Sequence, residues 1–495
     1  MRLKIDNIIT TAIVGGSDNL LDFDIMKELQ KYLRVRPDGY ERTTAYMDGR
    51  WDGYKYFITK GGKFATGFLP LVANFLTSLG VQILIEDVRG ELPVLSDTLD
   101  DFIGEIDGTI WLANEETGRA YQLEQVAALK NYINVGGQEI YFPRGILDCA
   151  TNAGKNSMAA LVANNLKTKY ETIFMVSNRT IYKQAVDFFS QVIGEPVGEV
   201  RTGKIDFKRF TVCMVKTLYN RAVKDSTIRT KLHRIKVLIV DESDESGATD
   251  YSKTLAFIGA GMRLFVSGTP LEASKVNNMI SIGLSGPVLS KITNKDLIDA
   301  GHSQKPIIKI LLNRTKLGYR MNYNDEKVKG IHTSLERVKL IEQILIEHSD
   351  KNVVVSFNDK IHGYFMYNYL KNALPNINMG IVHGDSKDRT EQIDDFKSGR
   401  ITVLFASMIL KRGANIPNIE VLIMGQGGKS VITVKQYLGR ALRHDGKSDT
   451  VLVFDFMDVG QYIGKHSRDR VRIYKKEGFE VEQMYEHKRG FPVLK

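Results

Sequence analysis

The chain has 495 residues, of which 43% are hydrophobic and 25% charged, so it can bury ordinary globular cores and is not a disordered sequence. No segment offers the roughly 18 apolar residues of a membrane span, and the first ten residues lack the apolar stretch of a signal peptide. We therefore expect a cytoplasmic protein without a membrane partner. Cys149 and Cys213 lie in apolar surroundings outside any CxxC pattern, so we expect them to be packing residues.

The net charge of +10 is unevenly distributed along the chain. Residues 301–495 contain 32 Lys and Arg against 22 Asp and Glu, a difference of 10 that equals the whole surplus. A basic surface of this kind suits a polyanionic partner, because neutralising phosphates releases counterions. On charge alone, a soluble basic protein with scattered lysines remains an equal alternative.

Residues 1–108 are expected to form a small α+β domain. Helical spacing covers Asp22–Val35 and Leu69–Leu79, and a strand is expected at Val81–Ile85. Between the two helices, aromatic and polar residues alternate in Thr43–Phe68, with glycines that break the pattern. The N-terminal part therefore differs in style from the rest of the chain.

Two long stretches, residues 109–287 and 331–495, alternate short β-branched runs with helical segments. Continuous apolar runs separated by helices are typical of a parallel sheet covered on both faces. We therefore expect two doubly wound α/β lobes joined by a connector at residues 288–330. The expected strands of the first lobe include Thr172–Val176, Phe210–Val215, Val237–Val240 and Leu264–Val266. Those of the second are Val353–Ser356, Met379–Val382, Thr402–Phe405, Val421–Met424 and Thr450–Phe454.

The segment Gly145–Ala159, which reads GILDCATNAGKNSMA, has the pattern of a phosphate-binding loop. An apolar strand runs into small residues, then Gly154 and Lys155, then a helix rich in Ala and Leu. Small residues let backbone N–H groups face a phosphate, the helix N-terminus adds its positive dipole, and the lysine reaches the β/γ oxygens. Taken alone, the pattern also fits an ordinary strand-to-helix turn.

The segment Val237–Asp244, which reads VLIVDESD, places adjacent carboxylates at the end of an apolar strand, where α/β sheets have their ligand crevice. We expect Asp241 to hold Mg²⁺ through water and Glu242 to orient and deprotonate the attacking water. Phosphoryl transfer needs mainly positioning and charge neutralisation, so one cation site and one base largely suffice. The lysine loop upstream argues against an ordinary acidic loop here.

With TNAGKN and DESD in one lobe, the chain resembles the DExD/H group of superfamily 2 helicases. The resemblance implies an α/β fold with two tandem RecA-like parallel-sheet lobes, preceded here by the small α+β N-terminal domain. Arg119–Gln122 looks like the group's adenine-reading motif, with Tyr121 stacking on the base and Gln122 on its edge. The other implied nucleotide contacts are Thr151, Asn152, Ala153, Gly154, Lys155, Asn156, Ser157, Gly413 and Asn415.

The remaining motifs of this group follow in order between about residues 117 and 472. Gln436–Arg443 resembles the motif that supplies arginine fingers, here Arg440 and Arg443, whose fixed forks bind phosphate bidentately. The implied coupling residues between the lobes are Ser267, Gly268, Thr269 and Gln436. The implied nucleic-acid contacts of the two lobes are Arg179, Thr217, His383, Arg389 and Ser407.

Two positions depart from the group's pattern. Asn156 stands where a Ser or Thr hydroxyl usually binds Mg²⁺, although an amide oxygen can also coordinate the ion. Arg412–Asn415 stands where Glu-Gly-Xaa-Asp is usual, which puts the ATP-ribose contact expected there in doubt. Either change can weaken nucleotide binding or slow turnover. The implied cofactors remain ATP and Mg²⁺, with Asn156 and Asp241 as the metal-binding residues.

Within the superfamily, the small N-terminal unit and compact lobes are similar to the UvsW-like helicases of large tailed bacteriophages. This finer match depends on Trp51-Asp52-Gly53 with Phe57 and on Lys31–Lys63, which has eight Lys and Arg against four Asp and Glu. Aromatic residues among basic ones can stack on bases or wedge a junction, so Trp51 is an expected nucleic-acid contact. An ordinary β-hairpin with a tyrosine ladder is equally compatible with the pattern.

The resemblance implies an ATP-dependent DNA helicase or translocase that unwinds or branch-migrates DNA in replication, recombination or repair. The expected partner is branched, forked or duplex DNA, with a monomer as one option for the assembly. An RNA helicase is a neighbouring alternative, and a degenerate clamp that binds without stepping is another. The complete set Lys155, Asp241, Glu242, Arg440 and Arg443 argues against the clamp, and a small-molecule α/β enzyme does not explain residues 436–443.

Overall fold

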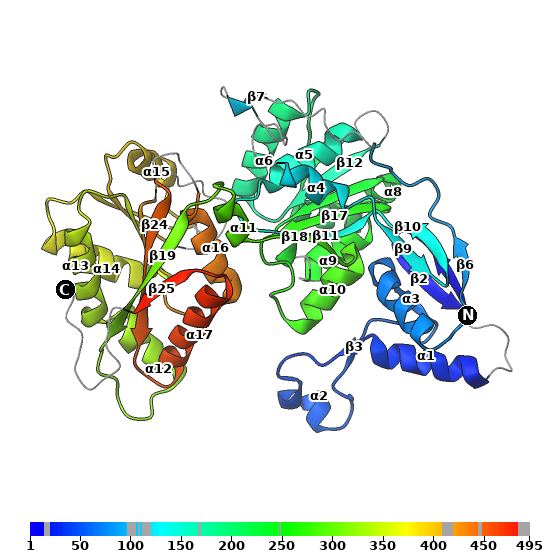
Figure 1. Ribbon diagram of the computed structural model, residues 1–495, viewed down its shortest axis with the longest axis horizontal. Helices are drawn as coiled ribbons and strands as arrows, with labels where there is room; N and C mark the ends of the chain where they lie inside the picture. Colours follow the sequence, from blue (N-terminus) through cyan, green and yellow to red (C-terminus); the bar gives the residue numbers. More distant parts are fainter. Residues whose placement is uncertain are drawn as a thin grey trace. The chain divides into compact units, whose positions relative to one another are not determined.

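The computed structural model describes residues 1–13, 20–96, 105–106, 109–110, 120–166, 170–245, 247, 249–407, 419–443 and 448–483. The chain divides into two compact units, one of residues 1–149 and 153–292 and the other of residues 150–152 and 293–495. Each unit is built around one large sheet (Figure 1). Across the ranges just given, no helix is both long and apolar enough to cross a membrane.

The large sheet of the first unit has eight strands in the order β14-β13-β15-β12-β16-β17-β11-β18. All neighbours are parallel except the edge pair β13–β14, which is antiparallel. Thr172–Val176 is a strand with the predicted bounds, and its five residues are all buried. The strands are β11 (Arg144–Cys149), β12 (Thr172–Val176), β13 (Gly198–Arg201), β14 (Lys204–Asp206), β15 (Phe210–Met214), β16 (Val237–Asp241), β17 (Met262–Ser267) and β18 (Val288–Ile292).

Side chains of the central strands alternate between two apolar layers, as the period of a strand requires. Phe174 meets Phe189 of α6 in an edge-to-face contact with centroids 4.7 Å apart, whereas Ile173 and Met175 join the core that contains Leu218 of α7. Helices α4, α5 and α6 lie along one face and α9 and α10 along the other (Figure 1). The helices are α4 (Tyr121–Ala127), α5 (Lys155–Asn165), α6 (Arg179–Val192), α7 (Val215–Lys224), α8 (Ser226–Arg234), α9 (Thr249–Ala256) and α10 (Lys275–Ser285).

A smaller mixed sheet with the order β5-β2-β1-β6 precedes the large one. Its strands β1 and β2 are antiparallel, β2 and β5 are antiparallel, and β1 and β6 are parallel. Short paired strands β3–β4, β7–β8 and β9–β10 accompany it. The elements are β1 (Arg2–Ile5), β2 (Ile9–Ile13), α1 (Leu20–Tyr32), β3 (Arg34–Val35), α2 (Thr44–Met47), β4 (Lys55–Tyr56), β5 (Lys63–Ala65), α3 (Leu69–Ser78), β6 (Leu84–Asp87), β7 (Glu105–Ile106), β8 (Thr109–Ile110), β9 (Tyr132–Val135) and β10 (Gln138–Tyr141).

The small sheet shares its core with the large-sheet part of the same unit. Its apolar cluster contains Phe142 from the segment before β11 and is extended by Met279 and Ile282 of α10. Arg144, 2% exposed, donates from its guanidinium to the backbone oxygens of Asn7, Leu284 and Ser285. The N-terminal part is therefore fixed to the first large sheet by both apolar and polar contacts.

The large sheet of the second unit has seven strands in the order β21-β22-β20-β23-β24-β19-β25, and every neighbouring pair is parallel. Val353–Ser356 and Met379–Val382 are strands with the predicted bounds. The two sheets confirm the expected α/β class. The strands are β19 (Lys305–Asn313), β20 (Val353–Ser356), β21 (Met379–Val382), β22 (Val403–Ala406), β23 (Val421–Ile423), β24 (Thr450–Asp458) and β25 (Glu480–Gln483).

Helices also cover both faces of the second sheet. Val353 and Val355 pack in one core with α13 and α14, while Val354 packs in the other with α15, α16 and α17. Figure 1 shows α13 and α14 on one side of the sheet and α16 and α17 on the other. The helices of this unit are α11 (Asn294–Asp299), α12 (Tyr323–Lys327), α13 (Leu335–Glu347), α14 (Lys360–Ala373), α15 (Arg389–Lys397), α16 (Val431–Ala441) and α17 (Tyr462–Lys476).

Residues 288–330, which we expected to be a connector, contribute one strand to each large sheet. β18 pairs with β11 at the edge of the first sheet, and β19 pairs with both β24 and β25 in the second. β18 is an edge strand with only Ile292 buried, so its sequence lacks the continuous apolar run of a central strand. Only the short α11 and its flanking turns separate these two strands.

A buried network of charged side chains holds α17 against β24. The Arg470 guanidinium donates to both oxygens of Asp455 at 2.8 and 2.9 Å, and the Tyr474 hydroxyl donates to Asp455 at 2.7 Å. All three side chains are at most 1% exposed. Burial and the neighbouring carboxylate raise the pKa of Tyr474, while Asp455 and Asp458 raise the pKa of Arg470. The bidentate geometry offsets the cost of removing these charges from water.

Replacing Arg470 with Leu should lower the free energy of unfolding by about 3–5 kcal/mol, because it leaves the Asp455 carboxylate buried without its cation. Arg472→Leu is the matched control, since Arg472 is 75% exposed and pairs with Asp469 on the helix surface. That surface pair should contribute less than about 1 kcal/mol. Urea unfolding followed by circular dichroism measures both variants. Equal midpoints for the two would contradict the importance of the buried pair.

Candidate nucleotide and nucleic-acid sites

The predicted phosphate-binding loop lies between β11 and α5. Gly154 caps the N-terminus of α5 with φ +78°, a left-handed conformation that glycine adopts without strain. A Cβ atom at this position would lie 2.2 Å from Nε2 of Gln122, so any other residue would displace the end of that side chain. Cys149, at the end of β11, is buried, and burial raises the pKa of its thiol to about 12. The thiol is therefore a packing group beneath the loop.

The two residues of the predicted adenine-reading motif hold the loop from α4. Gln122 is 2% exposed, and its amide donates to the backbone oxygen of Ala153 at 2.9 Å. The Tyr121 hydroxyl lies 3.1 Å from the same oxygen. Both side chains therefore fix the backbone of the loop just before Gly154. Arg119, the first residue of this motif, lies outside the described residues.

The polar side chains of the loop and of the first turn of α5 differ in burial. Lys155 and Asn156 are half-buried, as are Thr151 and Asn152, whereas Ser157 is 3% exposed. Within the described part of the chain, Lys155 has no hydrogen-bond or ion-pair partner. Its ammonium group at a helix N-terminus, beside a glycine-flanked backbone turn, is suited to bind an anion.

Asp241 ends β16 and is 6% exposed, and Glu242 follows in a left-handed conformation with φ +50°. This conformation is uncommon for a residue with a side chain and occurs often at functional sites. The backbone N–H of Glu242 donates to Oδ1 of Asp241 at 2.9 Å, which fixes the turn. The acidic pair therefore lies in a backbone turn that the side chain of Asp241 holds.

Three neighbouring parallel strands bring the motifs of this unit together. β17 pairs with β16 on one side and with β11 on the other, so three carboxyl ends meet at one edge. Strands lie about 4.8 Å apart, which separates β11 from β16 by about 10 Å. The loop follows β11, Ser267 ends β17, and Asp241 ends β16. The fold therefore collects the phosphate loop, the acidic pair and the coupling segment.

Asp244 links the acidic motif to the coupling segment. The Ser267 hydroxyl donates to Oδ1 of Asp244 at 2.9 Å and accepts the backbone N–H of Thr269 at 3.1 Å. Ser267 and Thr269 are each 2% exposed, and Gly268 between them is half-buried. The sequence did not predict this hydrogen bond, because DESD and SGTP are separate motifs and nothing in either motif indicates that they pair.

The predicted nucleic-acid residues of the first unit lie on the neighbouring strand ends. Arg179 begins α6 directly after β12, with Asn178 capping the helix, and Thr217 lies in the first turn of α7 after β15. Because β12 and β15 pair in parallel, both residues are at the same edge as Asp241. Arg179 is exposed and Thr217 is half-buried.

The predicted nucleic-acid residues of the second unit follow β21 and β22, which pair in parallel. The Ser407 backbone N–H donates to the oxygen of Val382, which directly precedes His383. The ring of His383 lies 3.2 Å from the Tyr364 hydroxyl, and Arg389 begins α15 shortly after. The structure thus brings His383 and Ser407 together at the carboxyl edge of the second sheet. Gly413 and Asn415 lie outside the described residues.

The two predicted arginine fingers lie at the end of α16. Arg440 is 8% exposed, while Arg443 is half-buried and forms an isolated β-bridge with Ser303. Burial lowers the pKa of Arg443. Gln436 lies one turn before Arg440 on the same helix and is half-buried. Gln436 and Arg440 therefore lie on α16, and Arg443 follows just after it.

The segment around Trp51 contains a cluster of tyrosines and arginines, which we call the Arg–Tyr cluster and define as Arg34, Arg36, Tyr40, Tyr54 and Tyr56. The guanidinium of Arg34 lies 3.8 Å from the ring centre of Tyr54, and that of Arg36 lies 4.5 Å from Tyr54 and 4.8 Å from Tyr40. Arg36 also donates to the Tyr40 hydroxyl at 2.9 Å. In this segment β3 pairs with β4, and Ile58 forms an isolated β-bridge with Phe64.

Trp51 itself packs into its own turn. It is half-buried, and its indole N–H donates to the backbone oxygen of Tyr54 at 2.8 Å. Arg36 and Tyr56 are among the exposed residues nearby, and the Tyr56 hydroxyl donates to Asp52 at 2.5 Å, which lowers the pKa of Asp52. The sequence identified this segment correctly as aromatic and basic, but the stacking of two arginines on tyrosines depends on the turn that Gly53 permits.

Comparison with known proteins matches each unit to a protein family. Residues 115–272 match the family described as "Type III restriction enzyme, res subunit". Residues 336–445 match the family described as "Helicase conserved C-terminal domain". The two matches fall one on each large sheet and include the phosphate loop, the acidic pair and the α16 arginines.

Individual relatives give the same result at low identity. The ATP-dependent DNA helicase uvsW of Enterobacteria phage T4 is 22% identical over 91% of this chain and 94% of its own length. The DNA 3'-5' helicase XPB of Kineococcus radiotolerans is 22% identical over 77% of this chain and 67% of its own length. Dbp5 of S. cerevisiae, solved with RNA and ADP BeF3, shares the fold with a TM-score of 0.51 at 14% identity, covering 73% of this chain and 88% of that one. The chain belongs to the superfamily 2 helicases, a family of ATP-dependent enzymes that bind nucleic acid.

Proposed function

We propose that this helicase hydrolyses ATP to move on DNA and acts on branched or forked DNA, as in replication, recombination or repair. The observation that supports the ATP part most directly is the meeting of three motifs on adjacent strand ends, β11, β17 and β16. The similarity that supports DNA is the T4 relative, which is named a DNA helicase and matches nearly the whole chain, including its N-terminal part.

Each group of the nucleotide site has a proposed role in hydrolysis. Lys155 neutralises the β/γ-phosphates, because its ammonium group has no partner among the described residues. Glu242 orients and deprotonates the attacking water, and its backbone has the left-handed conformation that occurs often at functional sites. Arg440 and Arg443 act as arginine fingers. Tyr121 and Gln122 bind the adenine in addition to holding the loop.

Asn156 and Asp241 are the residues that would hold Mg²⁺. Oxygen donors are the ligands that Mg²⁺ prefers, and both side chains supply them. Asp241 ends β16, two strands from the loop that carries Asn156. When bound, the ion neutralises charge on the phosphates. Gly154, with its left-handed φ, keeps the loop backbone in the conformation that receives the anion.

Glu242→Gln should keep ATP binding but lower turnover by about two orders of magnitude or more, the scale of a lost general base. Asp244→Asn is the matched control, because an asparagine oxygen can still accept the Ser267 hydroxyl and most turnover should remain. Single-turnover hydrolysis and equilibrium ATP binding are measured for both. If Asp244→Asn loses turnover and Glu242→Gln does not, Asp244 is the base.

The Arg–Tyr cluster is the proposed DNA contact of the N-terminal part, with Trp51 as its internal support. Arginines that lie on tyrosine rings present planar cations for phosphates, and exposed rings offer faces on which bases stack. Removal of residues 1–108 cannot test this, because it would uncover the core shared with Phe142 and Ile282. Point variants at Arg34 and Arg36 leave that core intact.

Arg34→Ala together with Arg36→Ala should weaken binding to forked DNA and flatten the slope of log affinity against log salt. The expected change is about 0.9 per lost phosphate contact on a duplex. Arg2→Ala together with Lys4→Ala removes the same charge from exposed partners of Glu86 and should change the slope little. Fluorescence anisotropy across a salt series gives the slopes.

ATP turnover of the unaltered chain with single-stranded, duplex and branched DNA, and with RNA of matched length, distinguishes the proposal from its alternatives. We expect the greatest stimulation with branched DNA. Equal or greater stimulation by RNA would replace the DNA proposal with an RNA helicase. Tight DNA binding without any stimulated turnover would favour a clamp.

A further inference from the structure

A second basic surface lies on the first unit, away from every motif used above. The segment Val215–Lys236 forms α7, α8 and the turn into β16, and it contains seven Lys and Arg against one Asp. The single acid, Asp225, is the N-cap of α8 and accepts the backbone N–H of Thr227. The basic residues are Lys216, Arg221, Lys224, Arg229, Lys231, Arg234 and Lys236.

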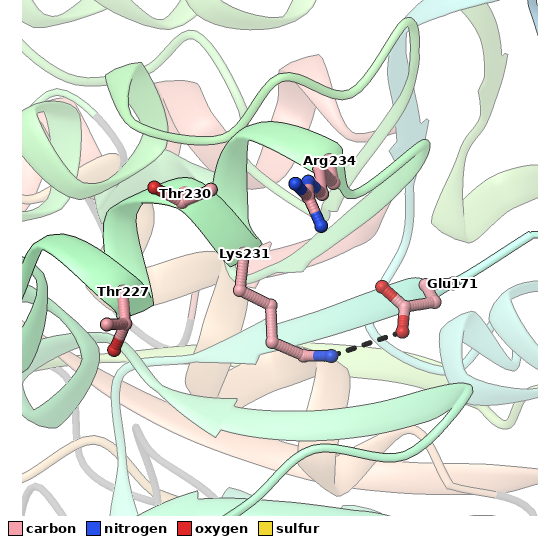
Figure 2. A pocket seen from close by; sticks show the side chains of 5 residues that line it. All are labelled: Glu171, Thr227, Thr230, Lys231 and Arg234. Carbon is pink, nitrogen blue, oxygen red and sulfur yellow. Dashed lines mark hydrogen bonds and ion pairs between the residues drawn. The ribbon is translucent and has the colours of Figure 1, made fainter.

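Two adjacent hollows lie along α8. One, of about 470 Å³, is lined by Thr227, Thr230, Lys231 and Arg234 of the helix and by Glu171 (Figure 2). The other, of about 480 Å³, again includes Thr230 and Arg234 and has an apolar part that contains Ile8 and Phe257. Because the hollows share two residues, they form one continuous surface along α8, which we call the α8 surface.

The cations of the α8 surface are available to a ligand. Arg234 is exposed and has no hydrogen-bond or ion-pair partner among the described residues. Lys231 pairs with Glu171 at 3.2 Å, but the two side chains are 36% and 43% exposed, and such surface pairs contribute little. Figure 2 shows this pair beside Arg234. Arg229 is held in place by donating to the oxygens of Ala222 and Val223.

The α8 surface lies at the edge of the sheet opposite the nucleotide site. α8 leads directly into the amino end of β16, and Glu171 directly precedes β12. The acidic pair lies at the carboxyl end of β16. Arg179 and Thr217, the proposed contacts to a DNA strand, follow the carboxyl ends of β12 and β15. A five-residue strand spans about 17 Å, so a ligand on α8 is separated from the proposed ATP site by about the length of a strand.

The chemistry of the α8 surface fits the backbone of nucleic acid. Threonine hydroxyls, lysine and arginine are the groups that contact phosphate oxygens, and such contacts position a duplex without reading its sequence. Sites for single strands instead use exposed aromatic rings for stacking, whereas no aromatic residue lines the first hollow and the rings at the second are those of His233 and the half-buried Phe257. Lys231 and Arg234, three residues apart on the helix, lie on neighbouring positions of one face.

We propose that the α8 surface binds the phosphate backbone of a duplex arm of the DNA substrate, on the side of the first unit opposite the ATP site. The inference rests on the proposed DNA function and names the part of the substrate that contacts this surface. Because the two edges of the sheet are separate, the duplex arm and ATP bind without competing. The helicase then contacts its substrate at two edges of the first large sheet. The single strand of the DNA lies at the carboxyl edge, and the duplex arm lies at the amino edge.

The test uses the full chain with Lys231→Ala and Arg234→Ala together. We expect weaker binding to a fork with a long duplex arm, and a salt slope reduced by about 1.8, since each lost duplex contact accounts for about 0.9. Binding to a short single strand, and the ATP turnover that this strand stimulates, should stay unchanged. Lys253→Ala with Lys371→Ala is the control, because it removes two exposed cations from α9 and α14.

Three outcomes would overturn the inference. An unaltered fork affinity and slope would show that α8 does not contact the duplex. An equal loss of affinity for the short single strand would show that Lys231 and Arg234 bind single-stranded DNA. If polyglutamate, used as an acidic-peptide probe, binds the unaltered chain and not the variant while fork binding is unchanged, the surface serves an acidic protein. Failure of the proposed function itself appears separately, as a lack of DNA-stimulated turnover in the unaltered chain.

Discussion

In a parallel sheet covered by helices on both faces, polar side chains can reach a ligand only at two edges. One is the edge where the strands begin, and the other is the edge where they end. In the first unit, β11, β16 and β17 are buried on both faces, so their carboxyl ends are where side chains can meet a ligand. The loop before Lys155, the acidic pair after β16 and Ser267 all lie there. The same constraint brings His383 and Ser407 together in the second unit. The order of the strands therefore decides which motifs meet.

Central strands could be predicted from the sequence because burial on both faces requires continuous apolar runs. Thr172–Val176 and Val353–Ser356 are such runs, and their bounds were predicted without error. Edge strands do not require such a run, although Met379–Val382, at the edge of the second sheet, contains one and was also predicted with its bounds. β18 has mixed polar and apolar residues, and the range that contains it was predicted as a connector. The division between the units therefore falls at Ile292, where one sheet has ended and the next has not begun.

The candidate site could be predicted as a set of motifs but not as a set of contacts. Lys155 and Asp241 lie in short local motifs whose residue types indicate their chemistry. The hydrogen bonds between these motifs connect residues that are far apart in the sequence. Gln122 donates to Ala153, 31 positions away, and Asp244 accepts the hydroxyl of Ser267, 23 positions away. Such pairs depend on strand order and helix placement, which one sequence does not contain. The left-handed backbone of Glu242 is likewise a property of the folded turn.

The guanidinium of Arg144 joins three segments that are far apart in the sequence. It bonds to the oxygen of Asn7 in the small sheet and to those of Leu284 and Ser285 at the end of α10, while its own strand β11 leads into the phosphate loop. If the buried guanidinium loses one of these acceptors, the free energy of desolvating that N–H group is no longer offset by a hydrogen bond. Loss of the N-terminal part would remove the Asn7 oxygen and leave one N–H group of the Arg144 guanidinium without its acceptor. Any replacement of this part would therefore have to place an acceptor oxygen at the position of Asn7 to keep the residue at the start of β11 hydrogen-bonded.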